Sequence, residues 1–337
     1  MDKLNPHFSE VIHLIQKARY QALKAVNTEL INLYWEIGKY ISERTTQEGW
    51  GKSTVVQLAN YIQTQEPGTK GFSDKNLWRM KQFYDTYAHS PKLAPLVREL
   101  SWTHNLIIFS RCKTDEEREF YLHLCKRENY NKRELERQIN AAYFERTMLG
   151  NTPNAALSTP LQVLPQNIGN VFKETYVLEF LNLPETFTEN ELETALVRKM
   201  KSFLLELGRD FLFMGEQYRL QVGNKDFFID LLFYHRQLQC LVAFELKTTD
   251  FAPEHLGQLN FYLEALDRDV KKPHENPSIG ILLCKGKDSE VVEYALSRHL
   301  SPTLVSEYQM ALPDKKLLQA KLHELIELWE NQKKEEI

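Results

Sequence analysis

The fold is decided by residues 226–247, which read DFFIDLLFYHRQLQCLVAFELK. Two apolar runs of strand length flank a short polar turn, and this pattern predicts a β-hairpin. Each run contains one acid, Asp230 in the first and Glu245 in the second. A hairpin centred between Gln237 and Leu238 places Asp230 opposite Glu245, because antiparallel partners lie at equal distances from the turn.

The second run ends in two charged residues, Glu245 and Lys247. They share one face of the strand because side chains alternate, and charge inside a sheet is costly unless it is paired or used. Two neighbouring carboxylates suit Mg²⁺ or Mn²⁺, and an adjacent lysine can position or deprotonate a water that attacks phosphorus. The pattern favours metal-assisted phosphodiester hydrolysis, and the alternative is a salt-bridged sheet end.

The residues around this hairpin predict a layered α/β or α+β domain. Helical patterns alternate with short runs rich in Val, Ile, Leu, Phe and Tyr. The expected helices are 189–207, 253–266 and 289–297, and the expected strands are 217–222, 226–233, 239–247 and 278–284.

Two helical positions add to the candidate site. Glu193 in the first of these helices offers a further acid near the metal, although a helical glutamate is commonly just solvated. Gln258 and Tyr262 are four residues apart and share a helix face. This pair either touches substrate or belongs to an ordinary amphipathic helix.

The first half of the chain predicts helices only. Apolar residues recur at helical spacing over 8–44, and Ser73 begins another helix. Thr114 with Glu117, and Asn131 with Glu134, form capping boxes that mark two more helix starts.

Residues 147–172 contain no charge and three prolines, which is typical of an interdomain linker. The last segment carries Leu318, Leu322, Leu325 and Trp329 at helical spacing. We therefore expect a helical domain over 1–146, a linker over 147–172, an α/β domain over 173–312 and an amphipathic helix over 313–337.

Composition excludes several classes of protein. The chain has 337 residues, of which 42% are hydrophobic and 26% charged, so it is not a disordered, collagen-like or disulfide-framework protein. The four cysteines are far apart and fit a reducing compartment. Neither a signal sequence nor a run of about 18–20 apolar residues is present. We expect a cytoplasmic protein without a membrane segment.

Charge is distributed unevenly between the halves. Residues 1–150 carry 22 Lys and Arg against 18 Asp and Glu, whereas the whole chain has a net charge of −4. Four cations gather around a break between two expected helices, Arg127, Lys132, Arg133 and Arg137. They suggest contact with a DNA backbone or a partner, but acidic residues among them also fit a solvated face.

The triplet Gly51-Lys52-Ser53 matches the last three residues of a phosphate-binding loop motif. Thr46 stands where that loop needs its first glycine, so we reject this interpretation.

The order Asp230, Glu245-x-Lys247 and Gln258-x-x-x-Tyr262 resembles the PD-(D/E)xK nuclease superfamily, and the last pair resembles the motif of its RecB-type branch. Longer stretches resemble bacterial proteins that join a PDDEXK nuclease domain to a helical N-terminal domain of unknown function. These stretches are 71–84, 100–109, 117–139, 218–247 and 256–285.

The resemblance implies an all-α N-terminal domain followed by an α/β restriction-endonuclease-like domain. It also implies that Asp230, Glu245 and the main-chain carbonyl of Leu246 hold Mg²⁺ or Mn²⁺ while Lys247 assists the water. Glu193 is the helix acid of choice, with Glu191 as its rival. Ile229 stands where the superfamily name has proline, a position that varies.

The implied function is DNA cleavage, in genome defence or recombination. The alternative is a non-catalytic DNA-binding or assembly subunit with a nuclease-like fold, and RNA cleavage would use the same chemistry. Cutting both strands of a duplex requires two sites or two events. A second copy or a multi-subunit assembly is therefore an expected partner besides DNA.

Overall fold

A computed structural model describes residues 5–150 and 171–335. The chain divides into two compact units, residues 1–139 and residues 140–337. Most of the predicted linker lies outside the described residues.

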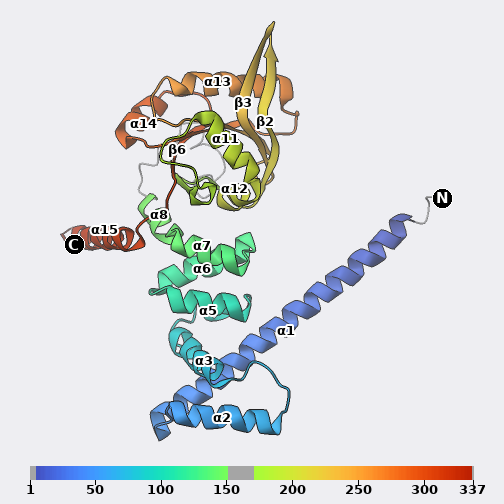
Figure 1. Cartoon of the computed structure of the whole chain (residues 1–337), viewed down its shortest axis with the longest axis vertical. Coiled ribbons are helices and arrows are strands. Elements are labelled where there is room, and N and C mark those ends of the chain that lie inside the picture. The colour runs from blue at the N-terminus through green and yellow to red at the C-terminus, as the bar shows by residue number, and fades with distance from the viewer. Residues whose placement is uncertain (1–4, 151–170, 336–337) are drawn as a thin grey trace. The chain divides into compact units, whose positions relative to one another are not determined.

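Unit 1 is entirely helical in its described part, as the sequence predicts (Figure 1). Its helices are α1 (Asn5–Glu48), α2 (Lys52–Gln65), α3 (Asp74–Tyr87), α4 (Ala94–Val97), α5 (Trp102–Arg111), α6 (Asp115–Glu128) and α7 (Lys132–Asn140, which ends one residue beyond the unit).

Capping side chains set three of these helix starts. Ser73, Thr114 and Asn131 each accept a hydrogen bond from the backbone N–H three residues later. These are the starts that the sequence predicts.

The core of unit 1 forms where α1 crosses α3. Tyr34 and Ile41 of α1 pack with Leu77 and Met80 of α3. A side chain at Gly38 would collide with the carbonyl group of Met80, so glycine permits this close crossing.

Unit 2 is a six-stranded mixed sheet covered by helices. It contains α8 (Tyr143–Gly150), β1 (Thr175–Val177), α11 (Glu189–Arg198), α12 (Met200–Leu207), β2 (Phe211–Val222), β3 (Lys225–His235), β4 (Cys240–Leu246), α13 (His255–Ala265), β5 (Ile279–Cys284), α14 (Ser289–Leu296), β6 (Thr303–Gln309) and α15 (Lys315–Glu335). A short 3₁₀ turn, Glu179–Leu181, follows β1, and one π-helical turn, Leu266–Val270, extends α13. The strand order is β1-β6-β5-β4-β3-β2, in which β2, β3 and β4 are antiparallel and the remaining pairs are parallel.

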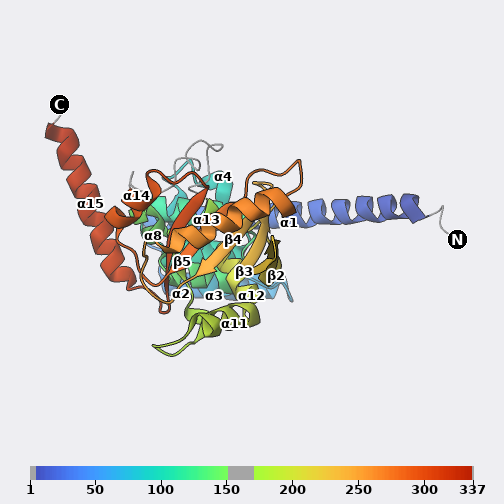
Figure 2. The ribbon, with the colours of Figure 1, turned by 90° about the horizontal axis from the view of Figure 1, so that it is seen from above.

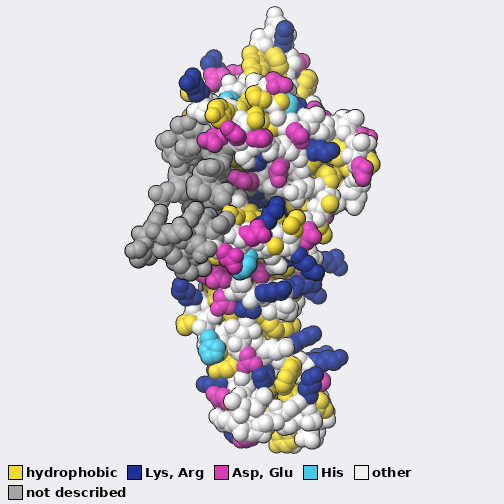
Figure 3. Space-filling view, turned by 90° about the vertical axis from the view of Figure 1, so that its left-hand side faces the viewer, with side chains coloured by type: hydrophobic (Ala, Val, Ile, Leu, Met, Phe, Trp, Pro, Cys, Tyr) yellow, Lys and Arg dark blue, Asp and Glu magenta, His cyan; other side chains and the backbone are white. Residues whose placement is uncertain are grey.

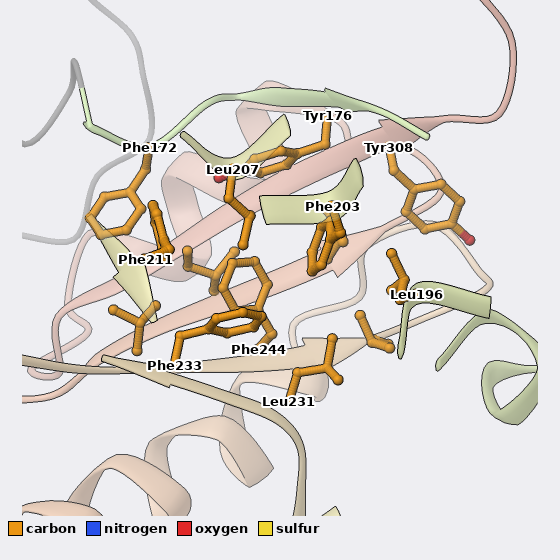
Figure 4. Packing of buried hydrophobic residues seen from close by; sticks show 14 of the residues in the cluster. Phe172, Tyr176, Leu196, Phe203, Leu207, Phe211, Leu231, Phe233, Phe244 and Tyr308 are labelled. Carbon is orange, nitrogen blue, oxygen red and sulfur yellow. The ribbon is translucent and has the colours of Figure 1, made fainter. Parts of the chain in front are cut away.

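Helices cover both faces of this sheet (Figure 2). One face packs against α11 and α12, and Phe203 of α12 lies 6.0 Å from the rings of both Phe233 and Phe244 (Figure 4). The other face packs against α13 and α14 through residues such as Leu259 and Val292. The central strands β4 and β5 are therefore buried on both sides, which explains why they are mainly apolar, whereas the edge strand β2 is largely exposed.

The structure confirms the fold class and adds two strands. The four predicted strands correspond to β2, β3, β4 and β5, whereas β1 and β6 were not predicted. The predicted helix 189–207 is interrupted at Lys199 and forms α11 and α12. None of the helices in the described parts of the chain is long and apolar enough to cross a membrane.

Candidate active site

Two neighbouring strands bring Asp230 and Glu245 together. The β3–β4 ladder pairs Leu231 with Phe244, so the next positions along it are Asp230 and Glu245. This is the predicted register. The backbone N–H of Leu246 donates a hydrogen bond of 2.8 Å to Asp230 Oδ2, which fixes that carboxylate at the end of β4.

Lys247 follows β4 directly and points its ammonium at two carboxylates. Its Nζ lies 3.0 Å from Glu245 Oε1 and 3.2 Å from Oε2 of Glu189, the first residue of α11. The Tyr308 hydroxyl donates to the Lys247 carbonyl, and the Lys247 N–H donates to the carbonyl of Leu283. Neighbouring strands thus hold the backbone that carries the lysine.

The site concentrates buried negative charge. Burial raises the pKa of Glu245 to about 7, and repulsion from Asp230 adds to the rise while Lys247 opposes it. Burial also raises the pKa of Asp230. Burial alone would lower the pKa of Lys247, but attraction to Glu245 and Glu189 outweighs burial, and the pKa is raised. A cation between the carboxylates would relieve this repulsion.

Glu245 supplies a direct test of whether a metal fits. Its side chain is 2% exposed, and Oε2 is a buried atom without a hydrogen-bond partner within the described structure. An ionised carboxylate buried in this way needs a partner for its second oxygen. A divalent cation that prefers oxygen ligands meets that need, so the donor set fits Mg²⁺ or Mn²⁺.

The four predicted metal ligands are not assembled as a closed cage. Within residues 5–150 and 171–335, no group of three His, Cys, Asp or Glu side chains is close enough to hold a metal by itself. Asp230 and Glu245 are adjacent, and Leu246 is the last residue of β4. Glu193 is linked to Asp230 by hydrogen bonds through a third side chain.

That residue is Gln217 of β2, which the sequence analysis missed. Its Nε2 donates to Glu193 Oε2 at 2.8 Å and lies 3.3 Å from Asp230 Oδ1. The β2–β3 ladder pairs Glu216 with Leu231 and Tyr218 with Ile229, so Gln217 stands opposite Asp230. Its φ of +41° is left-handed, which is uncommon for a residue other than glycine. A glutamine within a strand pattern gives no signal of this conformation.

The structure separates the two rival helix acids. Glu191 accepts a hydrogen bond from the Thr188 backbone N–H at 2.8 Å and completes a capping box. Glu193 is buried and hydrogen-bonded to Gln217. Glu193 is therefore the acid that α11 directs toward Asp230, and Glu191 caps the helix.

Comparison with known proteins identifies the relatives of this chain. Residues 169–323 match the YhcG PDDEXK nuclease domain, and residues 10–146 match the DUF1016 N-terminal domain. YhcG of Escherichia coli (strain K12) is 33% identical over 344 residues, which cover 91% of this chain and 90% of the relative. The chain belongs to the YhcG family of PDDEXK nuclease-domain proteins.

Two solved structures show a distant likeness to this chain. A repair endonuclease from Pyrococcus abyssi is 17% identical with a TM-score of 0.26, over 39% of this chain and 50% of that chain. A complex of EndoMS with double-stranded DNA is 17% identical with a TM-score of 0.25, over 40% of this chain and 49% of that chain. This chain spans about half the length of each, and so low a score carries no functional argument.

The YhcG nuclease domain of this chain contains all the predicted site residues, including the pair on α13. Gln258 Nε2 donates to the Tyr262 hydroxyl at 2.7 Å, so the two residues share a face as predicted. Gln258 is exposed and Tyr262 is buried. Burial raises the pKa of Tyr262, and the negative charges of Glu245 and Asp230 add to the rise. The pair therefore lies within electrostatic reach of the strand carboxylates.

Proposed function

We propose that this chain hydrolyses phosphodiester bonds of DNA at Asp230, Glu245 and Lys247 with Mg²⁺ or Mn²⁺. The observation that carries the proposal is the unpartnered Oε2 of buried Glu245, opposite Asp230 and beside the Lys247 ammonium. Membership of a PDDEXK nuclease-domain family supports it.

Each residue of the site has a distinct role in this proposal. Asp230 and Glu245 would hold the metal together with the carbonyl of Leu246. A cation bound there would lower the pKa of a water and neutralise phosphate charge. Lys247, anchored by Glu245 and Glu189, donates hydrogen bonds to the attacking water or to the phosphoryl oxygens.

Gln217, Glu193 and the α13 pair complete the proposed site. Gln217 holds Asp230 and Glu193 in place through its amide. Exposed Gln258 contacts the substrate backbone, and the Tyr262 hydroxyl orients the Gln258 amide. A role in genome defence or recombination follows from the family resemblance and is part of the same proposal.

Plasmid cleavage tests the proposal. The purified chain is incubated with supercoiled plasmid and Mg²⁺ or Mn²⁺, beside Asp230→Asn, Lys247→Ala and an EDTA control. Asp226→Asn is the matched control, because Asp226 lies on the same strand but pairs with Arg219 at 2.9 Å, away from the site. We expect cleavage to fall by about a hundredfold or more in the first two variants and to persist in the control.

Three results would contradict this proposal. If Asp230→Asn protein cleaved plasmid as fast as the unmodified chain, Asp230 would not belong to the catalytic site. Folded, metal-binding protein that leaves plasmid, single-stranded and branched DNA intact would instead favour an assembly subunit. If the chain cleaved RNA but no form of DNA, the substrate would be RNA and not DNA.

A further inference from the structure

The N-terminal half of α1 has an apolar stripe that nothing in its own unit covers. Residues 10–26 are all exposed, and the first buried residue of the helix in its described part is Ile31. Figures 1 and 2 show this part of α1 extending past the other helices of unit 1. Phe8, Ile12 and Val26 are 59%, 53% and 66% exposed.

Ten exposed positions of α1, seven of them apolar, follow alternating steps of four and three residues, and exposed Leu23 and Leu30 lie beside them. Such spacing forms the seam of a coiled coil, in which the first and fourth positions of each heptad face a partner helix. All members of this seam are exposed: Phe8, Ile12, Ile15, Arg19, Ala22, Val26, Glu29, Leu33, Glu36 and Tyr40. Helices gain most of their stability in water from packing of an apolar face, so an uncovered seam of this length calls for a partner.

The seam contains one cation, Arg19, and two acids, Glu29 and Glu36, and Glu29 lies ten residues after Arg19. When two α1 helices run antiparallel about a centre at Lys24, Arg19 of one copy meets Glu29 of the other, twice. In a parallel pair Arg19 would meet Arg19 and Glu29 would meet Glu29, which like-charge repulsion disfavours.

The same centre pairs the remaining seam positions with one another. It brings Ile15 opposite Leu33, Ala22 opposite Val26, Phe8 opposite Tyr40 and Ile12 opposite Glu36. Seam residue meets seam residue in every layer, and three of the four layers are apolar on both sides.

We propose that α1 pairs with α1 of a second copy of this chain as an antiparallel coiled coil centred at Lys24. The pairing covers the exposed stripe and makes the chain a homodimer. It rests on the helical unit alone and is independent of the nuclease site.

Sedimentation equilibrium of the full chain tests the pairing. We expect a reversible dimer. Arg19→Glu and Glu29→Arg should each weaken it by about tenfold or more, because each creates two like-charge contacts. The double variant restores opposite charges and should recover the dimer. Lys24→Glu is the control, since Lys24 lies on the opposite side of the helix from the seam.

A cross-linking assay checks the register in a second way. Ala22→Cys with Val26→Cys should form interchain disulfides under mild oxidation, whereas Lys24→Cys should not, because it faces away from the partner helix. The four natural cysteines are buried. Circular dichroism of each variant confirms that the helices are retained.

Four results would overturn the pairing. The chain could stay monomeric at all concentrations, which would mean that another element or protein covers the stripe. The single charge variants could leave the dimer intact, or the double variant could fail to restore it. Lastly, Lys24→Cys could cross-link as well as the seam cysteines.

Discussion

Asp230 and Glu245 could be predicted as neighbours from sequence because hairpin pairing follows from the position of the turn. The observed ladder from Leu231–Phe244 to His235–Cys240 has the register that the turn implies. Gln217 and Glu189 could not be predicted in the same way. Gln217 reaches the site through a left-handed backbone, and Glu189 reaches Lys247 through the packing of α11, and neither follows from local sequence.

Changing Gln217 to glutamate tests its position between the carboxylates. Gln217→Glu places a third acid between Glu193 and Asp230, so it should lower the free energy of unfolding by roughly 1–2 kcal/mol without metal. Mn²⁺ should raise the unfolding temperature of this variant more than that of the unmodified chain, because the added charge attracts the cation.

Gln221→Glu is the matched control, since it adds the same charge to an exposed position of the same strand. Thermal unfolding with and without Mn²⁺ gives the comparison. Equal Mn²⁺ shifts in both variants would show that Gln217 does not sit beside a metal site.

At the scale of elements, the strongly patterned segments were predictable and the short ones were not. Residues 227–233 of β3 are apolar except for Asp230, and β4 is apolar except for Glu245. By contrast, β1 has only three residues and β6 contains Ser306, Glu307 and Gln309. These two strands extend the sheet by parallel pairing, of β6 with β5 and of β1 with β6, which is a tertiary effect.

The crossing of α1 and α3 yields a stability prediction. Gly38→Ala should lower the free energy of unfolding by roughly 1–3 kcal/mol, because the new methyl group would force the helices apart at Met80. Chemical denaturation measures the difference. Gly257→Ala is the control, since no heavy atom lies near its added methyl group and alanine favours a helix by about 0.5–1 kcal/mol. If Gly38→Ala left the free energy of unfolding unchanged, the close crossing of α1 and α3 would be contradicted.

At the scale of the whole molecule, the sequence separates a helical unit from an α/β unit. Figure 3 shows Lys and Arg side chains on the surface of the helices of unit 1, with acidic side chains among them. Around the break between α6 and α7, Arg127 Nε lies 2.6 Å from Glu128 and Arg137 lies 3.2 Å from Glu134. Lys132 and Arg133 are exposed at the start of α7.

These two exposed cations give a prediction for nucleic-acid binding. Lys132→Ala with Arg133→Ala should weaken DNA binding and reduce the slope of log affinity against log salt by about 2, because each phosphate contact contributes about one released counterion. Fluorescence anisotropy at several salt concentrations measures the slope, with Lys24→Ala on the opposite side of α1 from its seam as the control. An unchanged slope would show that Lys132 and Arg133 do not contact DNA phosphates.

The most direct test of the active site is metal binding to Glu245. Isothermal titration of the full chain with Mn²⁺ is compared with Glu245→Gln and with the control Asp226→Asn. Replacing the unpartnered oxygen by an amide removes the charge but keeps the shape. If Glu245 is a metal ligand, the affinity for Mn²⁺ should fall by at least about tenfold in Glu245→Gln and stay the same in Asp226→Asn. Equal affinity in all three proteins would contradict a metal held by Asp230 and Glu245.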